Sequence, residues 1–210
     1  MKYGKQIFGV MLSVIAMGAW AQPQFSHPHG LYRQTTLTVG ISATDSEAEI
    51  RYTIDGSVPT AQSNLYTAPL TINATTLLRA AEVKADTLCS AVTTASYIFV
   101  ESVLSQPNDP VGYPAEWGQY TDIQGTAIAD YEMDPEMTGD ETLRLKIVEG
   151  LYDLPILSIV TDKDNLFSHE NDTARGGIYI FTGPPVGDAT GHGWTRPASV
   201  ELIGGPQAHD

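Results

Sequence analysis

Residues 24–100 consist of short segments in which hydrophobic and polar side chains alternate. The segments are "TLTVGIS", "EIRYTID", "APLTI", "TLLRAAEV" and "AVTTASYIFV". In the second, Ile50, Tyr52 and Ile54 fall on one face of an extended chain, because successive side chains of a strand point to opposite sides. Turn-forming residues separate the segments. This spacing of Thr-, Val-, Ile- and Tyr-rich segments predicts an antiparallel β-sandwich.

Residues 101–137 have a different pattern, with prolines, aromatic residues and acidic residues close together. Proline removes a backbone donor and favours extended conformations in the residue before it. A disordered linker would carry fewer aromatic residues. We therefore expect an ordered, extended connector in which Tyr113, Trp117 and Tyr120 pack against other parts of the chain.

Residues 138–210 alternate between helical and extended patterns. "GDETLRLKIVEGL" predicts a short helix that begins after the cap residue Asp140 and ends at Gly150. The continuous apolar run "LPILSIVTD" predicts a strand buried on both faces. "DNLFS" predicts one helical turn capped by Asp164, and "GGIYIFT" and "ASVELI" predict further strands. The whole chain is thus expected to be mainly β: a sandwich, a connector and an incomplete α+β segment.

Residues 1–21 have the composition of a secretory leader. Lys2 and Lys5 precede an apolar run, and Ala19-Trp20-Ala21 fits the rule for leader cleavage, so we expect cleavage after Ala21. The apolar run is too short for a spanning helix, so no membrane span is expected after cleavage. This predicts a secreted or cell-envelope location.

The net charge of −14 argues against nucleic acid as a partner. No Lys or Arg occurs from Ala85 to Leu143. A nucleic-acid-binding protein needs a basic face to neutralise phosphates. The single cysteine, Cys89, has no partner for an internal disulfide. The fold is therefore expected to depend on its apolar core.

Two short patterns resemble chemical sites. Asp55-Gly56-Ser57 is interpreted as a turn, because Gly tolerates positive φ and an Asp side chain accepts backbone N–H groups, whereas a nucleophilic Ser requires an oriented His. Asp162, Asp164 and Asn165 are weak Ca²⁺ candidates. The positions at which an EF-hand loop has Gly and Glu hold Phe167 and Thr173. No cofactor is expected.

The stretch around "RYTIDGSVPT" resembles the chitobiase/β-hexosaminidase C-terminal-type domain, also described as fibronectin-type-III-associated. The matching positions are Tyr52, Thr53, Asp55, Gly56, Ser57, Pro59, Thr60, Tyr66, Pro69, Arg79 and Ala80. The resemblance implies a small immunoglobulin-like (Ig-like) β-sandwich over residues 24–100. It also implies an accessory module of secreted bacterial enzymes.

A second stretch, from about Trp117 to Ile203, resembles the beginning of CotH-type proteins, a family named for spore-coat protein kinases. The resemblance lies in "DYEMDP", "LPILSIVTDKDNLFSHE", "GGIYI" and "GWTRPASVELI". None of that family's catalytic positions has a counterpart here. The resemblance therefore predicts a truncated CotH-like segment over residues 138–210.

Three functions are compatible with these patterns. The first is a secreted, non-catalytic accessory or structural module, with no enzyme activity in this chain. The second is a carbohydrate-binding module, in which Tyr66, Tyr113, Trp117 or Tyr120 stacks on sugar. The third is a fragment of a CotH-type protein kinase. Polysaccharides or cell-surface proteins are the expected partners, and the sequence does not predict an oligomeric state.

Overall fold

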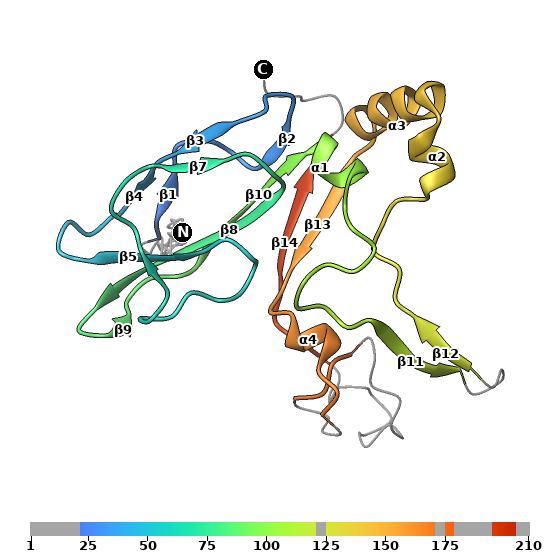
Figure 1. Cartoon of the computed structure of the whole chain (residues 1–210). Helices are drawn as coiled ribbons and strands as arrows, with labels where there is room; N and C mark the ends of the chain where they lie inside the picture. Colours follow the sequence, from blue (N-terminus) through green and yellow to red (C-terminus); the bar gives the residue numbers. More distant parts are fainter. Residues whose placement is uncertain (1–21, 121–124, 171–174, 179–194, 205–210) are drawn as a thin grey trace, which may run out of the picture.

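The computed structural model describes residues 22–120, 125–170, 175–178 and 195–204 (Figure 1). The fold is mainly β, with antiparallel sheets and a few short helices, in agreement with the expected sandwich. The expected leader, residues 1–21, lies outside the described residues.

Two layers form the sandwich. One is a six-stranded sheet with the strands β2 (Gly30–Tyr32), β10 (Thr93–Phe99), β8 (Thr76–Lys84), β5 (Glu49–Thr53) and β6 (Asn64–Leu65) in that order, and with β9 (Thr87–Leu88) paired to β8. The other contains two strand pairs, β1 (Gln24–Phe25) with β4 (Ile41–Ser42) and β3 (Leu37–Val39) with β7 (Leu70–Ile72). Within the sandwich β2 runs parallel to β10, and the other pairs are antiparallel.

The sandwich core lies between these layers, as the alternation predicts. Its buried members are Tyr32, Leu37, Val39, Ile41, Ile50, Ile72, Leu78, Ala80, Ala95, Tyr97 and Phe99. Tyr52 is partly buried and packs against them. The prediction for Ile54 is wrong, because β5 ends at Thr53 and the side chain of Ile54 is 55% exposed. The chain has already turned there towards Asp55.

The connector after the sandwich is ordered and contains more regular structure than expected. It begins with the helix α1 (Val100–Leu104) and includes a hairpin of β11 (Glu116–Tyr120) and β12 (Gly125–Ile128). Tyr113 and Trp117 contact the ring of Tyr131 edge to face, which provides the packing that the sequence predicts for these two aromatic residues.

The segment after the connector begins with the helices α2 (Pro135–Gly139) and α3 (Glu141–Asp153). The cap prediction is confirmed, because the carboxylate of Asp140 accepts hydrogen bonds from the backbone N–H groups of Thr142 and Leu143. The predicted end at Gly150 is wrong. Its carbonyl accepts a hydrogen bond from the N–H of Leu154, so the helix continues to Asp153.

The strands β13 (Ile156–Val160) and β14 (Ser199–Ile203) form an antiparallel pair. The helix α4 (Asp164–Phe167) follows β13. In the predicted strand "GGIYIFT", residues 176–178 are not in a strand and residues 179–182 lie outside the described residues.

The prediction that β13 is buried on both faces is wrong. Ile156 packs with Ile203 in a second hydrophobic cluster, which also contains Tyr152 of α3. The other face of the pair is exposed. It carries Leu157, Ile159, Val200 and Leu202, whose exposed fractions lie between 59% and 69%. A continuous apolar run does not show whether a second layer covers the strand.

The pair β13–β14 packs on the face of β10 that points away from the sandwich core. Ser96 of β10 donates its hydroxyl to the Glu201 carboxylate at 2.5 Å and also lies 2.6 Å from the hydroxyl of Ser158 in β13. Nδ1 of His29 lies 2.7 Å from the other carboxylate oxygen of Glu201. Glu201 is only 7% exposed, and a buried carboxylate needs such partners to offset its lost hydration.

We expect Glu201→Ala to loosen β13–β14 while leaving the sandwich folded. The change removes the acceptor of the buried Ser96 hydroxyl and the partner of the partly exposed His29 ring, at a cost of about 1–3 kcal/mol. Hydrogen exchange should show faster exchange in β13 and β14. Glu149→Ala, on the exposed side of α3, is the matched control and should change nothing. Unchanged protection of both strands in Glu201→Ala would show that the network contributes little to their packing.

Candidate functional site

The turn after β5 is formed by hydrogen bonds within the motif. Oδ1 of Asp55 accepts the hydroxyl of Ser57 at 2.6 Å and its backbone N–H at 3.0 Å. The Ser57 hydroxyl, opposed by burial, lowers the pKa of the Asp55 carboxyl below its usual value. Thr53 donates its hydroxyl to the carbonyl of Ser57 at 2.6 Å. Ser57 therefore donates to a carboxylate that shapes the turn, and this arrangement does not activate it as a nucleophile.

The remaining motif residues also have structural roles. Arg79 is buried and donates from a terminal guanidinium nitrogen to the carbonyl of Gly56 at 3.0 Å; burial lowers the pKa of this guanidinium. The Tyr66 hydroxyl accepts the backbone N–H of Ile41 at 3.0 Å. Oγ1 of Thr60 accepts the N–H of Gln62.

The two motif prolines differ in their surroundings. Pro59 is fully buried, whereas Pro69 is exposed. The interpretation of Asp55-Gly56-Ser57 as a turn thus agrees with the hydrogen bonds, and most of the remaining motif residues support the same corner of the sandwich.

The same corner contacts the segment after the sandwich, which the sequence did not indicate. Oδ1 of Asp162 accepts the backbone N–H of Val58 at 2.6 Å. Gly56 has a φ of +83°, and a Cβ at this position would lie 3.2 Å from both Cγ1 of Val160 and Cδ1 of Leu77. Glycine is therefore required both by the backbone conformation and by the close approach of β13.

Two of the three Ca²⁺ candidates have hydrogen-bond partners within the protein. The Asp162 carboxylate accepts from Val58, and the Asn165 side chain donates to the Thr161 hydroxyl at 2.6 Å. The helix α4 is capped at Lys163, so the predicted cap role of Asp164 is wrong. The described residues contain no group of three or more His, Cys, Asp or Glu side chains that could hold a metal ion.

The proposed sugar-stacking residues that the structure describes contact other tyrosine rings of the chain. Tyr66 is partly buried and meets Tyr52 edge to face. Tyr113 and Trp117 are inclined by 64° and 83° to the ring of Tyr131, between them. The side chain of Tyr120 lies outside the described residues. The three described rings each pack against another tyrosine of the chain, and whether any of them stacks on sugar stays a prediction.

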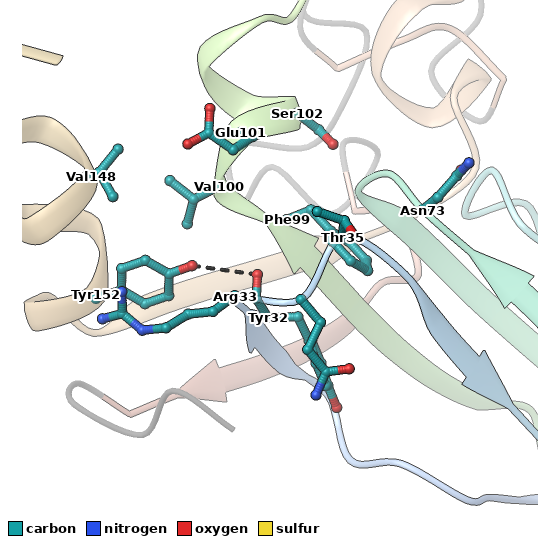
Figure 2. Close-up of a pocket in the computed structure, with 11 residues that line it drawn as sticks. Tyr32, Arg33, Thr35, Asn73, Phe99, Val100, Glu101, Ser102, Val148 and Tyr152 are labelled. Carbon is teal, nitrogen blue, oxygen red and sulfur yellow. Dashed lines mark hydrogen bonds between the residues drawn. The ribbon is translucent and has the colours of Figure 1, made fainter. Parts of the chain in front are cut away.

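A pocket of about 260 Å³ lies where the sandwich meets α1 and α3 (Figure 2). Four parts of the chain line it, namely the segment from Tyr32 to Thr35, Asn73 after β7, residues 99–102 and the α3 residues Val148 and Tyr152. Phe99 and Val100 are buried, which gives the pocket an apolar wall.

One cationic, one aromatic and one acidic side chain lie at the wall of this pocket, namely Arg33, Tyr152 and Glu101. The guanidinium of Arg33 lies 3.7 Å from the centroid of the Tyr152 ring, within the range of a cation–π contact. The Tyr152 hydroxyl donates to the carbonyl of Tyr32 at 3.3 Å, and burial raises the pKa of this phenol. The Glu101 carboxylate forms an ion pair with Arg144 of α3.

Neither Arg33 nor Tyr152 was predicted as a site residue from the sequence. They are separated by more than a hundred positions, and no local motif marks either residue. A weak signal was present in α3, where Tyr152 follows Val148 by one helical turn and extends its partly buried face. Only the packing of α3 against β2 and α1 brings these residues together.

We expect Gly56→Ala to destabilise the protein by about 1–3 kcal/mol, since the new methyl group requires a left-handed backbone and meets Val160 and Leu77. Chemical denaturation measures the change. Gly125→Ala is the control, because nothing lies within 4 Å of a Cβ at that position. Equal stability of the two variants would contradict the close packing of β13 on the corner.

The described residues contain no helix long and apolar enough to cross a membrane. Comparison with known families gives one match, in which residues 27–94 fit the sequence model of the chitobiase/β-hexosaminidase C-terminal domain. No curated protein and no solved structure matches the chain. The family match covers less than half of the chain, and none of these comparisons supports the expected CotH-like segment. The sandwich, from its second strand to the start of β10, is thus similar to the chitobiase/β-hexosaminidase C-terminal domain.

Proposed function

We propose that this chain is a secreted, non-catalytic accessory module of a multidomain bacterial protein that acts on or binds carbohydrate. The observation that carries the proposal is the family match over residues 27–94 together with the structure of the motif within it. Asp55, Ser57 and Arg79 carry the side chains of the motif that are most often catalytic in proteins. All three form hydrogen bonds to groups within the corner.

The role of such a module would be to position its neighbours. The corner contacts the segment after the sandwich through Val58 and Asp162, and β10 contacts it through Ser96 and Glu201. Two separate sets of contacts resist rotation of the C-terminal segment about the connector. A rigid spacer with this property presents whatever follows it at a fixed orientation, whereas a flexible linker would not.

The likeness of "LPILSIVTDKDNLFSHE" and "GWTRPASVELI" to CotH-type proteins supports a narrower version of this proposal. In that version the module and residues 138–210 belong to a CotH-like surface or extracellular protein. The alternative is a fragment of a CotH-type protein kinase, and activity measurements on the chain distinguish the two.

The purified mature chain is expected to show no turnover of ATP with Mg²⁺, no phosphotransfer to a generic protein substrate and no hydrolysis of a chromogenic β-N-acetylhexosaminide. The control is a preparation of Gly125→Ala, which should be equally inactive and equally folded. Turnover that co-purifies with the chain and is lost on Asp55→Asn or Asp162→Asn would contradict the proposal, because it would assign chemistry to groups we describe as structural.

Secretion is tested separately by expressing residues 1–210 in a bacterial host and measuring the mass of the product. We expect a mature protein that begins at Gln22, found in the periplasm or the medium. Ala21→Arg should block cleavage, because the peptidase needs a small residue there, while Gln24→Arg should not. An uncleaved product in the cytosol would refute the proposed location.

A further inference from the structure

The pocket between the sandwich and α3 is bordered by one exposed arginine, Arg33, that has no ion-pair partner among the described residues. Within the described part of the chain the guanidinium of Arg33 has the Tyr152 ring as its only partner, and no carboxylate or carbonyl accepts from it. The other charged group on the wall, Glu101, is already paired with Arg144. In a chain with a net charge of −14, Arg33 therefore lines this pocket without an acidic partner among the described residues.

The orientation of Arg33 is restricted before any ligand binds. Tyr152 is buried, its hydroxyl is hydrogen-bonded to the backbone of β2, and its ring face lies against the guanidinium (Figure 2). Stacking leaves the edge of the guanidinium plane, with its five N–H donors, available to a planar acceptor. A carboxylate is the acceptor whose geometry matches two parallel N–H groups.

The rest of the pocket suits a ring with hydroxyl groups. Phe99, Val100 and Val148 provide an apolar wall. At the rim, the side chains of Gln34 and Asn73 have no hydrogen-bond partner among the described residues, so their donors and acceptors are available. The volume of about 260 Å³ is near the lower limit for small-molecule pockets and suits one small ring.

Ser102 adds a further polar group. Its Oγ accepts the N–H of Thr75 at 3.1 Å, which leaves its hydroxyl hydrogen available as a donor. Ser102, Gln34 and Asn73 thus add neutral polar groups to a pocket that has one cationic side chain and one apolar wall. This combination fits a pyranose with a carboxylate: its C–H face contacts the valines, its hydroxyls reach the amides, and its carboxylate reaches Arg33.

We propose that this pocket binds a carboxylate-bearing sugar, such as the uronate unit of an acidic polysaccharide, with Arg33 as the carboxylate-binding residue. The choice of a sugar rests on the proposed association with carbohydrate-active proteins, whereas the choice of a carboxylate rests on Arg33 and its surroundings. The site uses α3 as well as the sandwich, so bound ligand would also stabilise the contact between these two parts.

Calorimetric titration of the mature chain with a galacturonate trisaccharide tests the proposal. We expect saturable binding that weakens about tenfold or more in Arg33→Gln, since a charge-assisted bidentate contact is lost. Arg33→Lys keeps the charge without the planar fork and should give intermediate affinity. Asn73→Ala and Gln34→Ala should each weaken binding severalfold. Far-ultraviolet circular dichroism and thermal unfolding show whether each variant is folded.

Arg175→Gln is the matched control, because this exposed arginine is paired with Glu170 and does not line the pocket. It should bind like the unaltered chain. Equal losses in Arg175→Gln and Arg33→Gln would indicate non-specific attraction and overturn the site. An absence of binding to the trisaccharide would overturn it as well.

Two further ligands test the carboxylate assignment and the sugar assignment separately. A neutral galactose trisaccharide should bind more weakly than the uronate; equal binding that is insensitive to Arg33→Gln would overturn the carboxylate assignment and leave the accessory function intact. A short glutamate peptide should bind weakly or not at all. Binding of the peptide as tight as that of the uronate would overturn the sugar assignment, while the activity and secretion measurements would still test the accessory function independently.

Discussion

The strand β10 is buried on both faces, and the arrangement of the molecule depends on this. Ala95, Tyr97 and Phe99 point into the sandwich core, whereas Ser96 points towards β14. Ser96 is fully buried at that position, so its hydroxyl needs a partner within the protein. The carboxylate of Glu201 meets this requirement by accepting from Ser96. The sandwich and the segment after it are therefore joined through a satisfied polar contact within an apolar surround.

The corner at Asp55-Gly56-Ser57 provides a second contact between the same two parts. Its hydrogen bonds fix the turn, and the absence of a side chain at Gly56 lets Val160 approach. Val58 then donates to Asp162 just beyond β13. The motif that is typical of the sandwich family thus also contacts the segment that follows the sandwich in this chain. Asp55, Ser57 and Arg79 all hydrogen-bond to groups of this corner.

The turn motif could be predicted from the sequence, whereas the pocket at Arg33 could not. It assigned the motif residues to a structural role because Asp, Gly and Ser have known turn preferences. It proposed Ca²⁺ ligands from the short acidic run at Asp162 and stacking residues from exposed aromatic types. The structure gives Asp162, Asn165 and Trp117 partners within the protein and does not test these two roles. The pocket at Arg33 was missed, because its walls come from four segments that no local pattern connects.

The sequence by itself determined the longer strands of the sandwich, the turn at Gly56 and the cap at Asp140, because alternation, backbone preference and capping act between residues near in the chain. The short strands β1, β2, β6 and β9 were not predicted. It could not determine that β13 is covered on one face only, that Glu201 pairs with Ser96, or that Arg33 lies over Tyr152. Those outcomes depend on which surfaces meet. The tertiary structure decides this through packing and through the need to satisfy buried polar groups.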